Sequence, residues 1–265
     1  MHTTLTTLIN RLESPALSGT DVIRWGCPVP SFGDLSTARV ATLGLNPSNR
    51  EFVDMSGKEL RGARRRFHTL RSLGLSSWVD VNAVHLRMIM DSCSAYFRRN
   101  PYDTWFRRLD QLISGTKASY YDASFGACHL DLIPYATQRK WTELSTRQRS
   151  VLLAVAADTL GVLLRDSPVQ ILILNGRSVV EGFQDLAGMS LVRRKMSSWS
   201  LRRQSKSVAG FAYTGVMNSI AGIGLGHELF VLGFNHNLQS SFGVTTELMR
   251  AIRDWIARIA SEVIQ

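Results

Sequence analysis

The chain has 265 residues, enough for one α/β domain with additions or for two small domains. Lysine and arginine (31) outnumber aspartate and glutamate (21), which leaves a formal net charge of +10. A surplus of that size favours a polyanionic partner, because neutralising phosphates releases condensed counterions, but it does not distinguish DNA, RNA and an acidic membrane surface. No apolar stretch approaches the roughly 18 residues of a membrane span, so we expect none.

The cysteines exclude the common metal centres. There are only three, with no C-x-x-C pair: Cys27, Cys93 and Cys128. A four-cysteine zinc or iron–sulfur site needs more ligands, and His85, His129 and His227 show no ligand spacing with Cys or acidic residues. We therefore expect no metal, no cofactor, and buried, reduced thiols in a cytoplasmic protein. The amino terminus has no basic region before an apolar run, so we expect no signal peptide.

The first half of the chain predicts one strand and three helices. Residues 1–25 are typical of a short amphipathic helix and a loop. Residues 39–45 form a short apolar run that ends in Asn46-Pro47-Ser48, which indicates a buried strand followed by a loop. Residues 58–75, rich in arginine and leucine, predict a helix, and so do residues 101–114, with proline at the start.

The second half repeats the alternation. Residues 127–133 form a second apolar run that stops at a proline. Residues 146–166 predict one long helix capped by Ser145, and residues 169–174 predict a third strand. Residues 229–234 predict a fourth strand, and a last helix runs from about residue 245 to the end.

These elements predict an α/β fold of three layers, α/β/α, around a central four-stranded, mostly parallel sheet. We expect a single domain over residues 1–265. Residues 190–217 break the rhythm with a basic stretch and then an alternating run, which predicts a small antiparallel insertion. In such folds the site lies beyond the carboxyl ends of the strands, here residues 46–48, 131–135, 175–176 and 235–241.

Two strand ends carry a resemblance to a known family. Gly44-Leu45-Asn46-Pro47-Ser48 resembles the first motif of the mismatch-specific and single-strand-selective branches of the uracil-DNA glycosylase superfamily, a Gly-x-Asn-Pro-Gly loop. Residues 236–241 lie where that family has a His-Pro-Ser-Pro-like second motif. The resemblance spans roughly residues 38–250 in element order. Ser48 replaces the last glycine of the first motif, and Asn-Leu-Gln replaces Pro-Ser-Pro in the second.

The resemblance implies a DNA glycosylase, which flips a nucleotide out of the stack and cleaves the bond between base and sugar. Asn46 would orient the attacking water, since an amide is a poor general base; otherwise it merely caps its loop. His236 would hydrogen-bond the base's O2 and stabilise the negative charge that develops there. Its alternative is a structural histidine bonded behind the sheet.

Asp131 is the most informative departure. Uracil-specific members have an asparagine at the end of this strand, and a carboxylate instead accepts from the N4 amino group of cytosine. If burial raises its pKa, a protonated Asp131 could also donate to cytosine N3. The alternative is a carboxylate that caps the next loop or pairs with Arg139.

The remaining candidates contact the base or the DNA. Phe52 and Tyr135 are candidates for stacking on the base, or else pack in the core. Leu238, or less favourably Gln239, could fill the gap left by the flipped base. Phosphate contacts are expected from the following residues: Ser48, Arg64, Arg65, Arg66, Ser240 and Ser241, with a second basic cluster at Arg193, Arg194 and Lys195.

We therefore expect a monomeric, monofunctional DNA glycosylase that leaves an abasic site; no lysine in the matched loops suggests a lyase. Excision of plain cytosine would destroy the host genome, so the substrate would be a modified cytosine, such as the glucosylated hydroxymethylcytosine of some phages, and the protein a defence enzyme. Within the class, the alternative is repair of uracil or another deaminated base. Outside it stand a non-catalytic nucleic-acid-binding protein and a small-molecule enzyme with this sheet.

Overall fold

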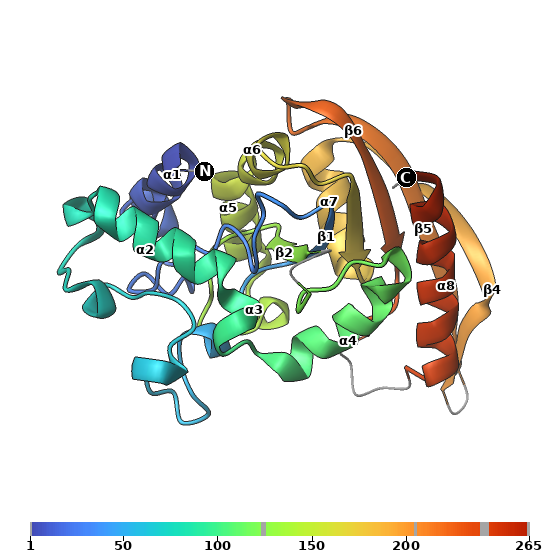
Figure 1. The fold of residues 1–265 in the computed structure, drawn as a ribbon, viewed down its shortest axis with the longest axis horizontal. Helices are drawn as coiled ribbons and strands as arrows, with labels where there is room; N and C mark the ends of the chain where they lie inside the picture. The colour runs from blue at the N-terminus through green and yellow to red at the C-terminus, as the bar shows by residue number, and fades with distance from the viewer. Residues whose placement is uncertain (1, 123–125, 204–205, 239–243, 264–265) are drawn as a thin grey trace.

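One mixed sheet runs through the centre of the molecule, with helices on both sides (Figure 1). The structure is a computed structural model that describes residues 2–122, 126–203, 206–238 and 244–263. The sheet has six strands in the order β2-β1-β3-β6-β5-β4. The α/β class is confirmed, but the expected four-stranded sheet is wrong in extent.

The parallel part of the sheet consists of β1 (Val40–Gly44), β2 (Ala127–Asp131), β3 (Ile171–Asn175) and the end of β6 (Ile223–Phe234). Every residue of β1, β2 and β3 is buried. Strands covered on both faces read as continuous apolar runs, which is why the sequence located them. The parallel register brings their carboxyl ends to one edge.

The antiparallel part consists of β4 (Val192–Arg203) and β5 (Lys206–Ile220), which pair with each other and with β6. The region expected as a separate insertion therefore extends the central sheet. A tight turn at Ala221 and Gly222, both with positive φ, joins β5 to β6. Glycines in the first half of β6 break the apolar alternation, so the sequence placed its start at residue 229 instead of Ile223.

Eight α-helices are found in the described part of the chain. They are α1 (His2–Leu12), α2 (Ala83–Ser94), α3 (Tyr96–Arg99), α4 (Asp103–Ile113), α5 (Thr146–Ala156), α6 (Thr159–Arg165), α7 (Arg177–Ala187) and α8 (Thr246–Val263). Short 3-10 turns lie at Pro15–Leu17, Asn49–Glu51, Gly62–Arg64, Arg71–Leu73, Trp78–Asp80, Ser114–Thr116 and Trp141–Glu143. No helix in the described ranges is long and apolar enough to cross a membrane.

Two helix predictions need correction. Ser145 caps α5 in a capping box with Gln148, as expected, but the helix expected over 146–166 is divided into α5 and α6. Arg11 of α1 binds Asp158 at this division, with an Nη2–Oδ2 distance of 2.7 Å. The helix expected over 58–75 is absent from the described structure. Its backbone pairs with the 25–27 segment instead, and Gly62 and Gly74 adopt positive φ.

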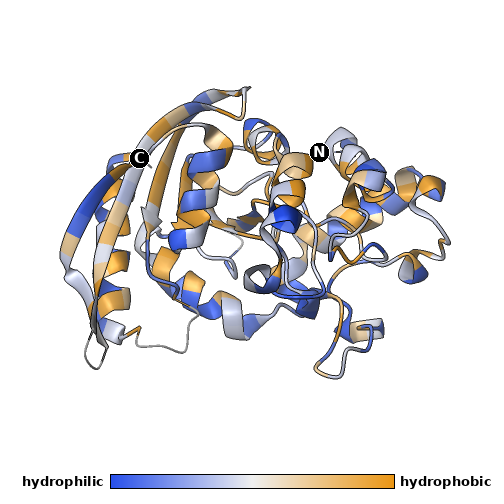
Figure 2. Cartoon of the chain, turned by 180° about the vertical axis from the view of Figure 1, so that it is seen from behind, coloured by the Kyte–Doolittle hydropathy of each residue, from blue (hydrophilic) through white to orange (hydrophobic). Residues whose placement is uncertain are grey.

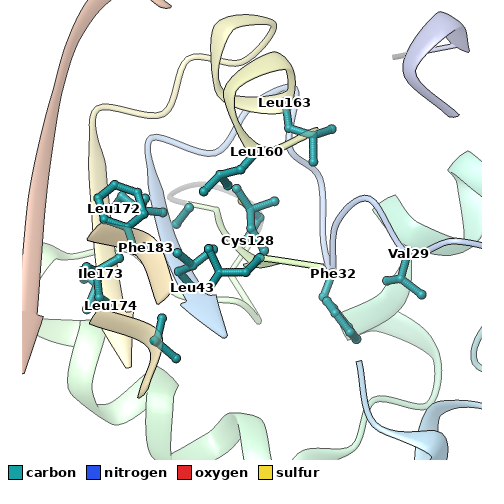
Figure 3. Close-up of a cluster of buried hydrophobic side chains, with 14 of the residues drawn as sticks. Val29, Phe32, Leu43, Cys128, Leu160, Leu163, Leu172, Ile173, Leu174 and Phe183 are labelled. Atoms are coloured by element: carbon teal, nitrogen blue, oxygen red, sulfur yellow. The ribbon is translucent and has the colours of Figure 1, made fainter. Parts of the chain in front are cut away.

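The core lies between the sheet and its helices. Figure 3 shows Leu43, Cys128, Ile173 and Phe183 within one apolar cluster. All three cysteines are free and buried, as expected. Figure 2 shows hydrophobic central strands, whereas β4 and β5 alternate between hydrophilic and hydrophobic residues. The hairpin of β4 and β5 therefore contains hydrophilic side chains, whereas the parallel strands contribute buried apolar side chains to the core.

Candidate functional site

A cavity of about 460 Å³ opens at the carboxyl edge of the parallel strands. Its size lies within the range of small-molecule sites, roughly 300–1,000 Å³. The lining comes from every parallel strand end and two tryptophans: Gly44, Asn46 and Ser48 after β1; Thr137, Arg139 and Lys140 after β2; Asn175, Gly176 and Arg177 after β3; Asn235 and Asn237 after β6; and Trp105 and Trp141. The cavity therefore lies at the edge of the sheet where the sequence predicted the site.

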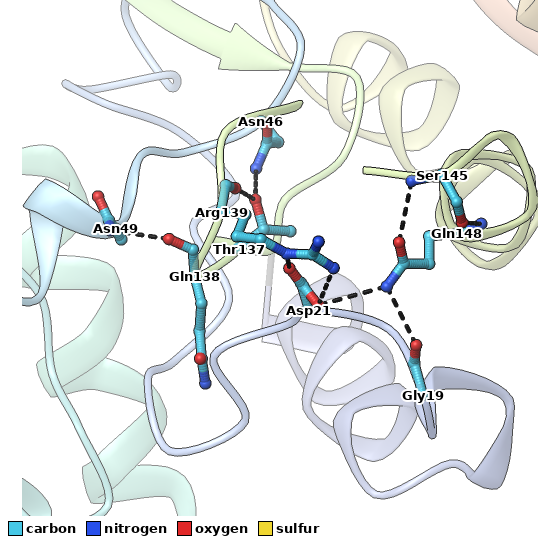
Figure 4. A network of polar contacts seen from close by, with 9 residues as sticks. All are labelled: Gly19, Asp21, Asn46, Asn49, Thr137, Gln138, Arg139, Ser145 and Gln148. Carbon is cyan, nitrogen blue, oxygen red and sulfur yellow. Dashed lines mark hydrogen bonds and ion pairs between the residues drawn. The ribbon is translucent and has the colours of Figure 1, made fainter. Parts of the chain in front are cut away.

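The amide of Asn46 has a fixed orientation in this cavity (Figure 4). Its Nδ2 donates to Thr137 Oγ1 at 2.9 Å and to the Pro47 carbonyl at 3.1 Å. The Thr137 hydroxyl donates in turn to the Arg139 carbonyl at 2.7 Å, so Thr137 Oγ1 is the acceptor towards Asn46. An amide whose nitrogen faces acceptors must turn its oxygen the other way. Oδ1 of Asn46 is therefore a preset acceptor.

The loop that fixes Asn46 is itself anchored. Arg139 forms an ion pair with Asp21, with an Nη2–Oδ1 distance of 3.0 Å, and this contact lowers the pKa of Asp21 (Figure 4). Asn49 Nδ2 donates to the Gln138 carbonyl at 2.9 Å on the other side. Arg139 thus pairs with Asp21 and does not neutralise Asp131, which removes one alternative for that carboxylate.

Asp131 lies directly against Gly44, beneath the cavity lining, to which Asp131 itself does not belong. A side chain on Gly44 would place its Cβ 2.3 Å from Asp131 Oδ1 and 2.9 Å from His129 Nε2. Asp131 is 6% exposed, and its Oδ1 lies 3.4 Å from His129 Nε2. Only glycine leaves room for this carboxylate next to β1, so Gly44 has a spatial role beyond its place in the motif.

His236 is turned away from the cavity. Its side chain is buried, and Nε2 lies 2.7 Å from the carbonyl oxygen of Trp199 in β4. Burial lowers the pKa of His236, and the bond to the carbonyl partly opposes this decrease. Its neighbours Asn235 and Asn237 line the cavity, but His236 does not. The structure therefore corresponds to the alternative of a structural histidine behind the sheet.

The two aromatic candidates for base stacking lie in the core. Phe52 is 2% exposed and packs edge-on against Trp25, with ring centroids 5.9 Å apart. Tyr135 is 1% exposed and donates its hydroxyl to the Leu8 carbonyl at 3.0 Å. Neither lines the cavity, where Trp105 and Trp141 are found instead.

The expected DNA contacts divide into three groups. Ser48 is exposed and lines the cavity. Leu238 is fully buried, so it does not protrude as a wedge, and Gln239, Ser240 and Ser241 lie outside the described residues. The cluster Arg64, Arg65 and Arg66 does not line the cavity. Arg66 Nε donates to the Asn100 carbonyl at 2.7 Å, and Arg66 also forms an ion pair with Glu51.

Sequence reasoning missed Glu51, because no local pattern marks it as buried. It is 3% exposed, accepts from the Tyr96 hydroxyl at 2.8 Å, and lies 3.9 Å from Arg66 Nε. Burial raises its pKa to about 7; Arg66 and Tyr96 oppose the increase, and the charge of Asp131 adds to it. A carboxyl that titrates near neutrality therefore lies in the loop that follows Asn46.

The amino end of α7 also faces the cavity through Gly176, Arg177 and Ser178. A helix presents partial positive charge at this end, and Lys140 adds an exposed cation at the opening. Arg139 and Arg177 also line the opening, but they form ion pairs with Asp21 and Glu181. In the residues that the structure describes, no group of three or more His, Cys, Asp or Glu is arranged to hold a metal ion. No model of a known protein family matches this sequence, and no curated protein matches it either.

Proposed function

We propose that the chain is a monofunctional DNA glycosylase that accepts an extruded nucleotide at this cavity and hydrolyses the bond between base and sugar. The observation that carries the proposal is the amide of Asn46 in the cavity lining, whose nitrogen is held by Thr137 so that its oxygen is left as an acceptor. A water bound to Oδ1 is oriented without being deprotonated, which is the contribution an amide can make.

The reaction joins the water oxygen to C1′ of the sugar as the bond from C1′ to the base nitrogen breaks. The base leaves with the bonding electron pair and takes up one proton, so the products are an abasic site and a free base. Positive charge develops on the sugar and negative charge on the base. Because His236 is buried against Trp199, we assign the stabilisation of the departing base to the amino end of α7.

The substrate is proposed to be a modified cytosine, such as glucosylated hydroxymethylcytosine in phage DNA, with the protein acting in defence. A carboxylate at Asp131 accepts from an exocyclic amino group and repels the O4 oxygen of uracil. The charge of +10 and the exposed Lys140 at the opening favour a phosphate backbone as the carrier of that base.

An abasic-site assay tests the proposal with duplexes and single strands that carry uracil, cytosine, hydroxymethylcytosine or its glucosylated form. We expect release from the modified cytosines, no strand cleavage without alkali, and loss of release in Asn46→Ala. Release from uracil alone would favour repair of a deaminated base. Absence of release from every substrate would overturn the enzymatic proposal.

The position of His236 favours one alternative outside the class, a nucleic-acid-binding protein without catalysis. The cations at the cavity would still bind phosphates, and the structural histidine would need no chemical role. In that case the chain binds DNA with strong salt dependence, and Asn46→Ala binds as the parent does, with no base released by either.

A further inference from the structure

A chain of four buried polar side chains starts next to Gly44 of the cavity lining and continues into the interior. Asp131 Oδ1 lies 3.4 Å from His129 Nε2, His129 Nδ1 lies 2.6 Å from Thr42 Oγ1, and Thr42 Oγ1 lies 2.5 Å from the Tyr120 hydroxyl. Each residue is at least nine-tenths buried. Buried polar groups must satisfy one another, so the hydrogens along this chain are ordered.

We call these four residues, Asp131, His129, Thr42 and Tyr120, the relay. Its outer end, Asp131, is adjacent to the cavity. Gly44 lines the cavity, and its missing side chain is replaced by the Asp131 carboxylate and the edge of the His129 ring. Trp105, which also lines the cavity, packs edge-on against His129 with ring centroids 4.9 Å apart. Asp131 and His129 therefore lie directly beneath Gly44 and Trp105 of the cavity lining.

Tyr120, at the inner end of the relay, determines which atom donates in each of its hydrogen bonds. Burial raises the pKa of Tyr120, so its hydroxyl stays protonated and needs an acceptor. Within the described part of the chain, the hydrogen bond of that hydroxyl is to Thr42 Oγ1. Thr42 then donates its own hydrogen to His129 Nδ1, so Nδ1 is an acceptor and the ring hydrogen lies on Nε2, facing Asp131.

We propose that His129 is a positioning residue whose Nε2–H, set by Thr42 and Tyr120, holds Asp131 as a hydrogen-bond acceptor. The imidazole hydrogen faces Oδ1, at an Nε2–Oδ1 distance of 3.4 Å, and we assign Oδ2 to the ligand. This inference rests on the proposed function and defines its substrate class as a base with an exocyclic amino group. The reversed tautomer would place the lone pair of Nε2 against Asp131 Oδ1 and would leave the Tyr120 hydrogen without its acceptor.

The first test is independent of catalysis. Long-range ¹H–¹⁵N correlation spectra of the imidazoles report which ring nitrogen carries the proton, and His129→Gln assigns the signals among the six histidines. We expect the Nε2–H form of His129 in the parent and in Thr42→Ser, which keeps the hydroxyl. Thr42→Val should shift His129 towards Nδ1–H. A predominant Nδ1–H form in the parent would overturn the inference, even if the chain is a glycosylase.

The second test measures base preference, the ratio of kcat/KM on the modified cytosine to kcat/KM on uracil in the same duplex. Loss of the hydrogen bond between Thr42 and His129 should reduce this ratio about tenfold in Thr42→Val, with Thr42→Ser restoring it. Tyr120→Phe is the second variant, should Thr42→Val fail to fold. An unchanged ratio in a folded variant would overturn the inference. If the parent releases no base, the proposed function is wrong. The spectra would still show which ring nitrogen of His129 carries the hydrogen and would therefore test the relay separately.

Discussion

The carboxyl ends of β1 and β6 lie on the same edge of one sheet, and both are followed by a polar residue of the expected motif. After β1, Asn46 lines the cavity, and Thr137 orients its amide. After β6, His236 is buried and bonded to the Trp199 carbonyl. The strand therefore determines where a residue lies, whereas the neighbouring segment determines which way its side chain points.

The difference has a physical origin in what covers each end. β1 lies between two other parallel strands, and its loop contacts another loop, residues 137–139, with which it lines the cavity. β6 is followed in the sheet by β5 and β4, and Trp199 of β4 packs against Trp255 of α8 with ring centroids 5.3 Å apart. A buried carbonyl at Trp199 needs a donor, and His236 supplies it.

The largest expected effect breaks the comparison at the β1 end. Asn46→Ala should reduce the rate of base release by about 10²–10³-fold, the usual cost of one oriented polar group in an active site. Single-turnover abasic-site formation measures the rate, and thermal unfolding should change little because Asn46 is only half-buried. Ser48→Ala, also in the cavity lining, is the matched control with a smaller effect. A decrease below tenfold in Asn46→Ala would contradict its assigned role.

The second prediction concerns Glu51, in the turn after Asn46. Its pKa is raised from 4.5 to about 7, so the folded state binds more protons than the unfolded state between these values. The free energy of unfolding should therefore fall as pH rises through this window, by about 3 kcal/mol for this group alone. Glu51→Gln carries no ionisable group at this position, so its free energy of unfolding should not fall in this way. Relative to the parent, the free energy of unfolding of Glu51→Gln should therefore rise by about 3 kcal/mol between pH 5 and pH 8.

Urea unfolding of both proteins at pH 5, 6, 7 and 8 measures this difference. The amide oxygen of the Glu51→Gln variant still offers an acceptor to the Tyr96 hydroxyl, so the comparison isolates the charge. Glu181→Gln, at an exposed carboxyl, is the control. A constant difference between Glu51→Gln and the parent over this range would exclude a buried carboxyl that ionises near neutrality.

The third prediction breaks the comparison at the β6 end. His236→Ala should lower the free energy of unfolding by about 1–3 kcal/mol, because the buried Trp199 carbonyl loses its donor. Base release should decrease only as far as the folded fraction does. His227→Ala is the matched control, since His227 Nε2 bonds the Val169 carbonyl at 2.9 Å but is less buried. A decrease of about a hundredfold in the rate of base release by fully folded His236→Ala would show that His236 takes part in the reaction.

The smallest effect sharpens the comparison through DNA binding. Lys140 lies at the cavity opening near the β1 end, and Arg193 is exposed on β4 above the Phe211 ring, 4.6 Å from its centroid. If DNA crosses both ends, Lys140→Ala and Arg193→Ala should each reduce the salt slope of binding by about one. Arg165→Ala, at the end of α6, is the control. A change for Lys140 alone would confine the DNA to the β1 side.

The sequence by itself determined the parallel strands, the capped start of α5 and the edge at which the cavity lies. Each of these depends on a local pattern: a short apolar run, a cap with its partner three residues later, or a polar loop after a strand. The free, buried state of the three cysteines followed from their small number and from the absence of a C-x-x-C pair. Local patterns also misled, since residues 58–75 have helical composition but pair with a segment far away in the chain.

Only the tertiary structure decided which polar side chains face the cavity. Phe52, Tyr135 and His236 occupy plausible sequence positions, yet their partners come from distant segments, and these partners bury them. The relay behind Asp131 joins residues from three segments that no spacing rule connects. Strand position follows from short-range hydrophobic pattern, whereas side-chain direction depends on packing and hydrogen bonds between elements far apart in sequence.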